Sequence, residues 1–232
     1  MRLGIETQSG VMSFIKCIAL LCVLSYSSSH TQAQKIENSP TIADILSGEF
    51  RVAFLGIDLS ETKFIGDKED WPGAEFIKTL NPAWNNLLAY DLRKYRILPR
   101  ALRLKPELVE YYPNICTIHN DKLSFGEAIM PVSFGEEINN DKIQSILDSY
   151  DFTDLTGIGL MIFIESFDAK NSLGTMYFTF LNLNTHKIIY SEKLNGNPAG
   201  VTPRKYWVET IHDVISQVQE IKYREWKKAY LR

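Results

Sequence analysis

The region between residues 157 and 195 constrains the fold of this chain more than any other part of its sequence. It holds three runs dense in β-branched and aromatic residues, a composition typical of strands. The three runs are Ile158–Phe167, Met176–Leu183 and Ile188–Leu194. Turn-forming residues at 168–174 and 182–187 separate them. Strands that follow one another this closely pair with their sequence neighbours, so we expect an antiparallel meander.

Two shorter apolar runs upstream predict further strands. Arg51–Asp58 is apolar almost throughout, which is the pattern of a strand covered on both faces. Ile115–Ile118 is the second run, and its Cys116 is expected to be a buried thiol without a reactive role. The segments 60–73 and 124–135 contain glycine and proline and are expected to be loops.

Helices are predicted between these strands by apolar residues at three- and four-residue spacing. One helix is expected to begin near Asn81, a capping residue followed by Pro82 at the first helical position. Pro99 stops or kinks it. Asn139 or the next residue caps another helix, and the last helix runs from about Arg204 with an unbroken apolar stripe.

The order strand, helix, strand, helix, three strands, helix predicts one α/β domain. Strands separated by helices indicate parallel crossovers, and the meander adds antiparallel strands, so a mixed sheet with helices packed on it follows. We expect a signal peptide at 1–33, with Met12 as the true start, and a polar lead-in at 34–48. The single domain then spans 49–222, and a basic, aromatic helix end occupies 223–232.

The beginning of the chain indicates export. Lys16 precedes a short apolar run at 17–26, which leads to a serine-rich neck and to small residues ending at Ala33. This is the organisation of a secretory signal peptide, and the run has about half of the roughly 20 residues that a membrane span needs. We predict a periplasmic or secreted protein without a later transmembrane helix. A lipid anchor is not expected, because bulky leucines precede Cys22.

Charge and cysteine content exclude several classes of partner and site. Removal of residues 1–33 takes away Arg2, Lys16 and Glu6 and leaves 23 basic and 27 acidic residues, a net charge of −4. This mild negative charge argues against a general nucleic-acid binder, so no nucleic-acid partner is expected. Cys116 is the one cysteine left after removal of the signal, which excludes an internal disulfide.

No motif in the sequence specifies a reaction, so we predict a protein without enzymatic activity, cofactor or metal. The chain has no nucleophile elbow, phosphate-binding glycine loop or dinucleotide-binding fingerprint. Its histidines are not at metal-ligand spacing. Asp148, Asp151 and Asp154 lack the glycine and the closing glutamate of a calcium loop.

Glu165 is the candidate acid of a pocket. Alternation along the first meander strand places it on the same face as Met161, Phe163 and Phe167. A carboxyl group among apolar side chains has a raised pKa, as a general acid requires. The simpler interpretation is that Glu165 lies near the strand end and reaches solvent or a lysine. A ligand-binding or hydrolase-like protein with a pocket around Glu165 is therefore a second hypothesis.

Arg204, Tyr206 and Trp207 form the candidate interaction surface. They follow an irregular Gly- and Pro-rich loop at 195–203. Such loops often carry recognition residues, and arginine and aromatic side chains concentrate in interfaces. The alternative for Trp207 is that it packs the start of the helix onto the sheet, because large aromatic side chains are usually buried.

Two basic stretches, at 93–105 and 222–232, admit two interpretations. The second interleaves lysine and arginine with Tyr223, Trp226 and Tyr230, a composition found in membrane-interface helices. Peripheral binding to an anionic membrane surface through the C-terminal helix is therefore a third hypothesis. The simpler interpretation is that these cations complement a helix dipole and solvate the last turn.

The C-terminal half also resembles a family of exported proteins. The resemblance is carried by Gly157–Phe167, Met176–Leu183, Lys187–Lys193, Ala199–Gly200 and Arg204–Trp207. With the first strand and helix, these residues resemble exported, largely uncharacterised proteins of Bacteroidetes-type bacteria. Their domain is similar to the periplasmic α/β domain of curli-secretion lipoproteins, penicillin-binding-protein activator lipoproteins and the amino-terminal domain of the Tol-system propeller protein. The resemblance implies a non-catalytic protein-interaction or assembly domain, whose partner is an envelope protein.

Overall fold

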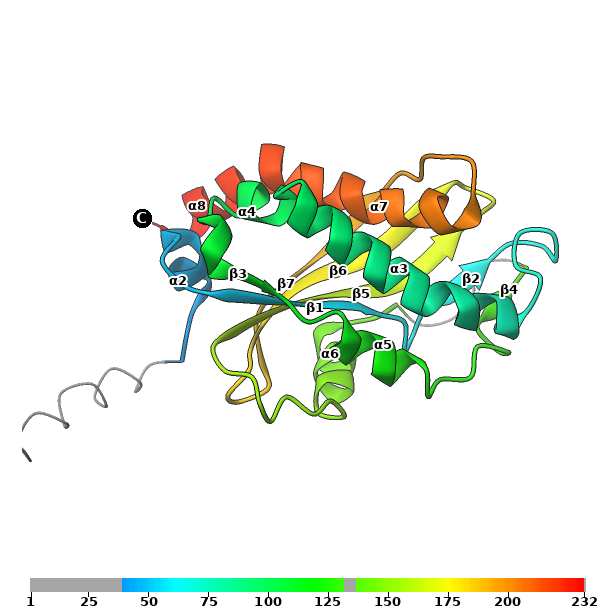
Figure 1. The fold of residues 1–232 in the computed structure, drawn as a ribbon, viewed down its shortest axis with the longest axis horizontal. Coiled ribbons are helices and arrows are strands. Elements are labelled where there is room, and N and C mark those ends of the chain that lie inside the picture. The colour runs from blue at the N-terminus through cyan, green and yellow to red at the C-terminus, as the bar shows by residue number, and fades with distance from the viewer. Residues whose placement is uncertain (1–38, 132–136, 232) are drawn as a thin grey trace, which may run out of the picture. The chain divides into compact units, whose positions relative to one another are not determined.

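The computed structural model describes residues 39–131 and 137–231, and its described residues from Pro40 onward form one compact unit (Figure 1). The predicted signal peptide and the first part of the predicted lead-in lie outside the described residues. Within the described residues, no helix is both long enough and apolar enough to cross a lipid bilayer.

A mixed sheet of seven strands forms the centre of the domain. The strands are β1 (Val52–Asp58), β2 (Lys63–Ile65), β3 (Val109–Tyr111), β4 (Ile129–Met130), β5 (Ile158–Asp168), β6 (Leu173–Asn182) and β7 (Lys187–Gly196). β5 pairs in parallel with β1 along its first half and with β2 along its last three residues. β3 pairs in parallel with β1, and β4 pairs in parallel with β2. β5, β6 and β7 form the predicted antiparallel meander.

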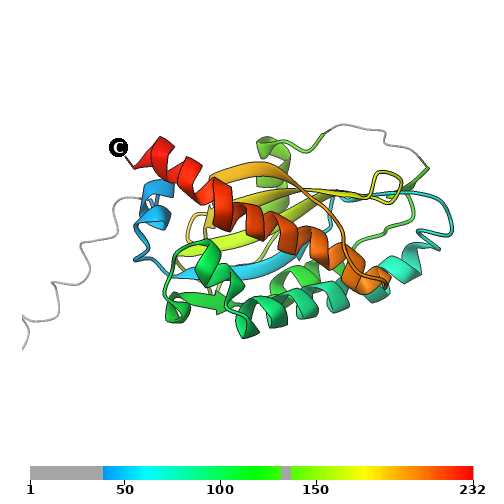
Figure 2. The ribbon, with the colours of Figure 1, turned by 90° about the horizontal axis from the view of Figure 1, so that it is seen from above.

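Helices cover both faces of this sheet. They are α2 (Ile42–Ser47), α3 (Ala74–Lys94), α4 (Ile97–Ala101), α5 (Asn114–Asn120), α6 (Asn140–Leu147), α7 (Pro203–Gln217) and α8 (Tyr223–Tyr230). A 3-10 turn, η1 (Pro106–Leu108), precedes β3, and a π-helical turn, η2 (Val218–Lys222), joins α7 to α8. α3, α4 and α7 lie on one face, and α5 and α6 lie on the other (Figure 1). Seen from above, α7 and α8 run together across the sheet beside α3 and α4 (Figure 2).

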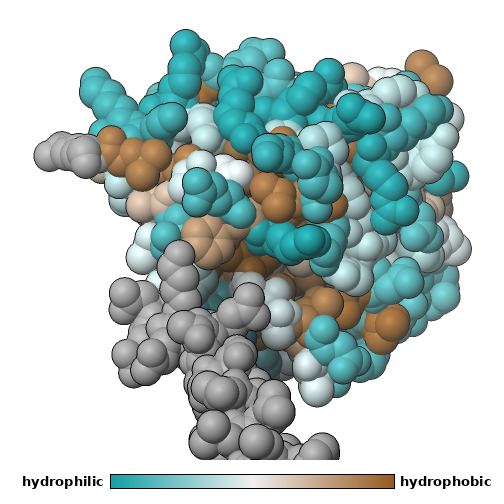
Figure 3. Space-filling model, turned by 60° about the vertical axis from the view of Figure 1, so that its left-hand side comes forward, coloured by the Kyte–Doolittle hydropathy of each residue, from teal (hydrophilic) through white to brown (hydrophobic). Residues whose placement is uncertain are grey.

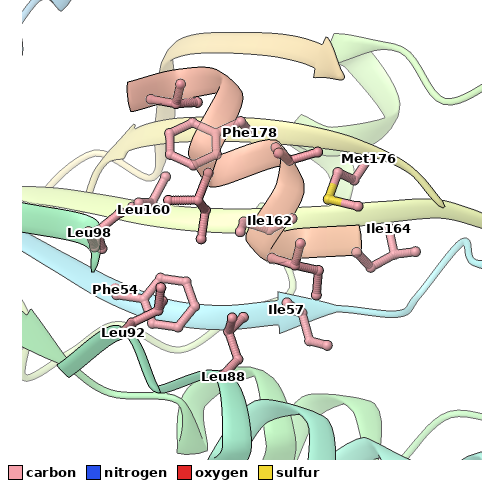
Figure 4. Packing of buried hydrophobic residues seen from close by; sticks show 14 of the residues in the cluster. Phe54, Ile57, Leu88, Leu92, Leu98, Leu160, Ile162, Ile164, Met176 and Phe178 are labelled. Atoms are coloured by element: carbon pink, nitrogen blue, oxygen red, sulfur yellow. The ribbon is translucent and has the colours of Figure 1, made fainter. Parts of the chain in front are cut away.

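Two apolar clusters hold these layers together. Successive side chains of β1 alternate between the faces, so Phe54 packs on the α3 side while Leu55 meets the α5–α6 layer. An irregularity in register between Phe54 and Gly56 shifts the alternation, and Ile57 therefore packs on the same side as Phe54. The larger cluster also takes alternate side chains of β5 and β6 (Figure 4). Because both faces of the sheet are covered, all seven residues of β1 are buried. The predicted doubly covered first strand is therefore confirmed.

The start of the long helix α3 differs from the prediction. The helix begins at Ala74, and Pro82 lies inside it instead of at its first position. Asn81 does not cap a helix, because its side chain donates to the Asp121 carboxylate (2.8 Å) and the Thr117 carbonyl (3.2 Å). Burial of the preceding turn, which contains Ile77, compensates for the hydrogen bond that proline cannot make.

The predicted strand Ile115–Ile118 is wrong, because these residues belong to helix α5. A four-residue apolar run carries no period, and of these four residues only Cys116 is fully buried. The strand after α3 is instead β3. The predicted loops at 60–73 and 124–135 contain the short strands β2 and β4, although residues 132–136 lie outside the described part.

The packed domain extends beyond the expected range of 49–222 at both ends. α2 lies in the expected lead-in, yet its Ile45 is buried in the core, and Thr41 caps the helix in a capping box with Asp44. At the other end, Tyr223 and Trp226 of α8 are buried against the sheet. The Asn139 cap of α6 and the start of α7 near Arg204 are confirmed.

Candidate functional site

The three residues of the predicted surface lie at the start of α7 but differ in exposure. Arg204 is exposed, Tyr206 is half-buried, and Trp207 is only 4% exposed. The Trp207 ring stacks on Trp71 at 5.2 Å and contacts Phe167 at 4.9 Å between ring centroids. Trp207 therefore packs the helix start onto the sheet, which was the alternative interpretation of this residue.

A cleft of about 350 Å³ lies beside this helix start, and we call it the α7 cleft. Its lining comes from the loop before β6, the loop before α3 and the start of α7: Glu69, Asp70, Ala169, Gly200, Val201, Thr202, Pro203, Tyr206 and Trp207. Val201 is 99% exposed, so a large apolar side chain stands in solvent at the cleft. The α7 cleft thus contains two of the three predicted surface residues, whereas Arg204 lies outside its lining.

The floor of the α7 cleft is fixed by contacts within the domain. The Asp70 carboxylate accepts a hydrogen bond from the Asp67 amide (3.0 Å), which closes the acidic loop. Trp71 donates its indole N–H to the Ile65 carbonyl (3.1 Å). At the opposite wall, the Tyr206 hydroxyl donates to the Ser172 hydroxyl (3.1 Å). Walls held in this way keep the cleft preformed, which lowers the entropic cost of binding.

Two carboxylates give the α7 cleft an acidic side. Glu69 and Asp70 are exposed and line it, and neither carboxylate is ion-paired within the described residues. Asp67, in the same loop, is ion-paired to Lys170 at 3.5 Å. The cleft therefore combines an apolar surface with unneutralised negative charge. The sequence did not indicate this part of the site, because the acidic loop is more than 130 residues away from α7.

Glu165 lies in a β-bulge of β5 and is 6% exposed. Its carboxylate accepts a hydrogen bond from the Ile138 amide (2.8 Å) and forms an ion pair with Lys193 (2.8 Å). Burial lowers the pKa of Lys193, but the carboxylates of Glu165 and Glu137 outweigh this and the net shift is upward. Glu165 is therefore ion-paired to a lysine, as in the simpler interpretation of this residue.

The bulge also corrects the predicted face of the strand. Phe163 and Glu165 lie on the α6 side, but Phe167 belongs to the opposite cluster with Ile164. An extra residue in a bulge reverses the alternation beyond it, and the sequence pattern gave no sign of this. A cleft of about 530 Å³ lies nearby, but Glu165 is not part of its lining. The lining consists of Glu61, Lys63, Glu137, Ile138, Asn139, Asp141, Lys142 and Ser145.

A buried polar cluster at the end of β1 was missed by sequence reasoning. Asp58 is 1% exposed and accepts hydrogen bonds from the Tyr150 hydroxyl (2.5 Å) and from the Ser60 hydroxyl (2.9 Å) and amide (2.9 Å). The Ser60 hydroxyl also lies 3.1 Å from Nε2 of His119, whose ring stacks on Tyr150. Burial raises the pKa of Asp58, although the bonds from Tyr150 and Ser60 oppose the shift.

This cluster does not have the geometry of a catalytic triad. In a triad the carboxylate binds the imidazole nitrogen remote from the serine. Here the Asp58 carboxylate accepts from Ser60 itself and lies 4.0 Å from Nε2 of His119, the nitrogen that already faces the serine.

Cys116 is a buried thiol, as predicted. Burial raises its pKa well above the ordinary value, which argues against a reactive thiol.

Asp58 makes the stability of the domain depend on pH. Because its folded pKa is raised, the carboxyl group contributes stability below its unfolded pKa and loses it as pH rises through the folded value. We expect Asp58→Asn to gain stability relative to the parent as pH rises from 4 to 7, measured by urea unfolding. His119→Gln in both proteins removes the neighbouring imidazole, so the comparison isolates Asp58. A difference in unfolding free energy that stays constant over this range would contradict the assignment.

Some cations of each basic stretch make contacts within the domain. Lys222 forms an ion pair with Glu192 of β7 at 2.9 Å, and the same carboxylate accepts from the indole of Trp226 (2.5 Å). The aromatic side of α8 therefore faces the sheet. In the first stretch, Arg103 donates to the Gln219 carbonyl (3.1 Å), and the Arg93 guanidinium lies over the Tyr111 ring.

Comparison with known proteins gives no relative from which a function could be transferred. No protein-family model matches the chain, and no curated protein or solved structure matches it significantly. Among residues 39–131 and 137–231, no group of three or more histidine, cysteine, aspartate or glutamate side chains is arranged to hold a metal ion.

Proposed function

We propose that this chain is an exported, non-enzymatic interaction domain of the cell envelope. In this proposal, the α7 cleft receives a basic segment of another envelope protein. The observation that carries the proposal is the cleft itself, which is lined both by Val201 and Tyr206 and by the carboxylates of Glu69 and Asp70. The export signal predicted at 1–33 and the resemblance to periplasmic interaction domains support the compartment and the type of partner.

The chemistry of the cleft favours a lysine- or arginine-containing segment. These side chains have an apolar stem and a cationic head, so one residue can contact Val201 and a carboxylate together. Charge complementarity steers such a segment toward Glu69 and Asp70 and sets its register. A neutral apolar segment would leave both carboxylates without a partner.

The other two hypotheses have weaker support. A pocket around Glu165 needs an acid free to exchange a proton with a ligand, whereas Glu165 is bonded to Lys193 and to the Ile138 amide. Membrane binding through the C-terminal helix needs an apolar face turned outward. Trp226 is instead 3% exposed and packs on Phe178 and Tyr190.

Peptide binding tests the cleft directly. The probe is a short peptide in which two lysines flank a leucine, titrated against the mature protein with Trp fluorescence as the readout, since Trp207 lines the cleft. We expect Glu69→Gln with Asp70→Asn to weaken binding about tenfold, since two exposed ion pairs of roughly 0.2–1 kcal/mol each are lost. The Asp70→Asn change keeps a side-chain oxygen that can accept the Asp67 amide, so the loop is preserved.

Two controls make this result decisive. Glu49→Gln removes an exposed carboxylate that lies outside the α7 cleft, and it should leave binding unchanged. A peptide with both lysines replaced by glutamine should bind the parent protein as weakly as the lysine peptide binds the double variant. Equal binding of the two peptides by the parent protein would refute a basic partner.

A further inference from the structure

β3 is an edge strand whose free side opens into a second cleft. Among the described strands, only β1 pairs with it. The Tyr112 amide donates to the Phe54 carbonyl of β1 (2.8 Å). The N–H of Val109 donates to the Pro106 carbonyl within η1. Because successive amides of a strand point to opposite sides, the N–H and C=O of Tyr111 and the C=O of Val109 point away from β1. Both residues line a cleft of about 420 Å³, which we call the β3 cleft.

The β3 cleft is positively charged. Arg93 and Arg96 line it, and neither is ion-paired to a carboxylate within the part of the chain that the structure describes. Glu110 is the acid in the lining, and Arg51 neutralises it through an ion pair of 2.8 Å. The Arg93 guanidinium lies 5.1 Å above the Tyr111 ring, which holds it beside the strand edge.

The surroundings extend this charge. Arg100 and Lys105 are exposed on the segments that follow α3, and no acid occurs between residues 93 and 105. Figure 3 views the molecule from the side on which β3, α2 and α8 lie in Figure 1. Hydrophilic side chains cover most of that face, and apolar ones show between them. The β3 cleft thus combines a free strand edge, apolar surface and unneutralised cations.

We propose that the β3 cleft binds an extended acidic segment of a partner protein by strand addition. The backbone of the segment pairs with the N–H and C=O of Tyr111 and with the C=O of Val109. Its aspartate or glutamate side chains, two residues apart, reach Arg93 and Arg96, whose planar guanidinium groups bind carboxylates in bidentate geometry. This site differs from the α7 cleft in position and in the sign of the charge it recognises.

The test uses a fluorescein-labelled peptide of alternating glutamate and valine, with fluorescence anisotropy as the readout. We expect Arg93→Gln with Arg96→Asn to weaken binding about tenfold or more, because two charge-assisted contacts are lost. Asparagine tolerates the left-handed backbone that Arg96 adopts (φ 50°). The matched control, Lys227→Gln with Lys228→Gln, removes two exposed cations of α8 and should leave binding unchanged.

Two further measurements separate strand addition from charge attraction alone. A peptide N-methylated at alternate residues keeps its carboxylates but cannot pair its backbone, and we expect it to bind at least tenfold more weakly. Hydrogen exchange of the Tyr111 amide should slow when the unmodified peptide binds. The proposal is overturned if both peptides bind equally, if neither binds, or if phosphatidylglycerol vesicles bind the protein while the peptide does not. None of these outcomes depends on whether the lysine peptide binds the α7 cleft, so the two proposals can fail separately.

Discussion

Replacing Trp207 by alanine is expected to destabilise the domain by about 3–5 kcal/mol, the usual cost of removing a buried tryptophan. The side chain is 4% exposed and lies between Trp71 and Phe167. Its loss removes the contact that holds the start of α7 on the sheet and leaves a cavity that the fixed backbone cannot fill. Urea unfolding followed by circular dichroism measures the change.

Arg204→Ala is the matched control for this prediction. Arg204 lies three residues away on the same helix but is exposed, so its loss should change the unfolding free energy by less than about 0.5 kcal/mol. If Trp207→Ala were no more destabilising than Arg204→Ala, the tryptophan would not be a packing residue, and the described start of α7 would be wrong.

The second large effect is expected from Gly196→Ala. A Cβ atom at Gly196 would lie 1.9 Å from the Thr210 carbonyl oxygen of α7, and Gly174, its partner in register, also faces Thr210. The helix approaches the sheet too closely here for any side chain. Because the obstacle is backbone, we expect a loss of about 3 kcal/mol, the upper part of the range for overpacking.

Gly126→Ala separates this steric effect from the general effect of replacing glycine. A Cβ atom at Gly126 meets nothing within 4 Å, so this variant should lie within about 0.5 kcal/mol of the parent protein. Thermal unfolding of both variants is the measurement. Comparable melting temperatures for the two would show that α7 and β7 are not in close contact at this point.

Strong periodic patterns made part of the fold predictable from sequence. The meander and α7 are confirmed because each meander strand carries a long run of β-branched and aromatic residues and α7 carries a continuous apolar stripe. The short elements were not predictable, because β2, β4 and the run at 115–118 are too brief to show a period. At Pro82, local capping chemistry pointed to a helix start, but tertiary burial of the preceding turn prevailed.

The candidate site was only partly visible in the sequence. The Gly- and Pro-rich loop before α7 indicated the helix start, but the acidic loop at 67–70 joins it through folding alone. The Asp58 cluster was missed because its members come from three separate segments of the chain. Their spacing in the sequence does not indicate that folding brings them together. Likewise, the β-bulge at Glu165 could not be predicted, because one extra residue in a strand does not change the composition that marks it as a strand.

Photo-crosslinking from position 201 in the native envelope tests the central claim most directly. A benzophenone amino acid replaces Val201 in one protein and Ile118, also exposed but outside the α7 cleft, in another. The account predicts one protein product from position 201, crosslinked through a lysine- or arginine-containing segment, which is lost in the Glu69→Gln, Asp70→Asn background and absent from position 118. Equal labelling from both positions, or a product that persists without the two carboxylates, would contradict it.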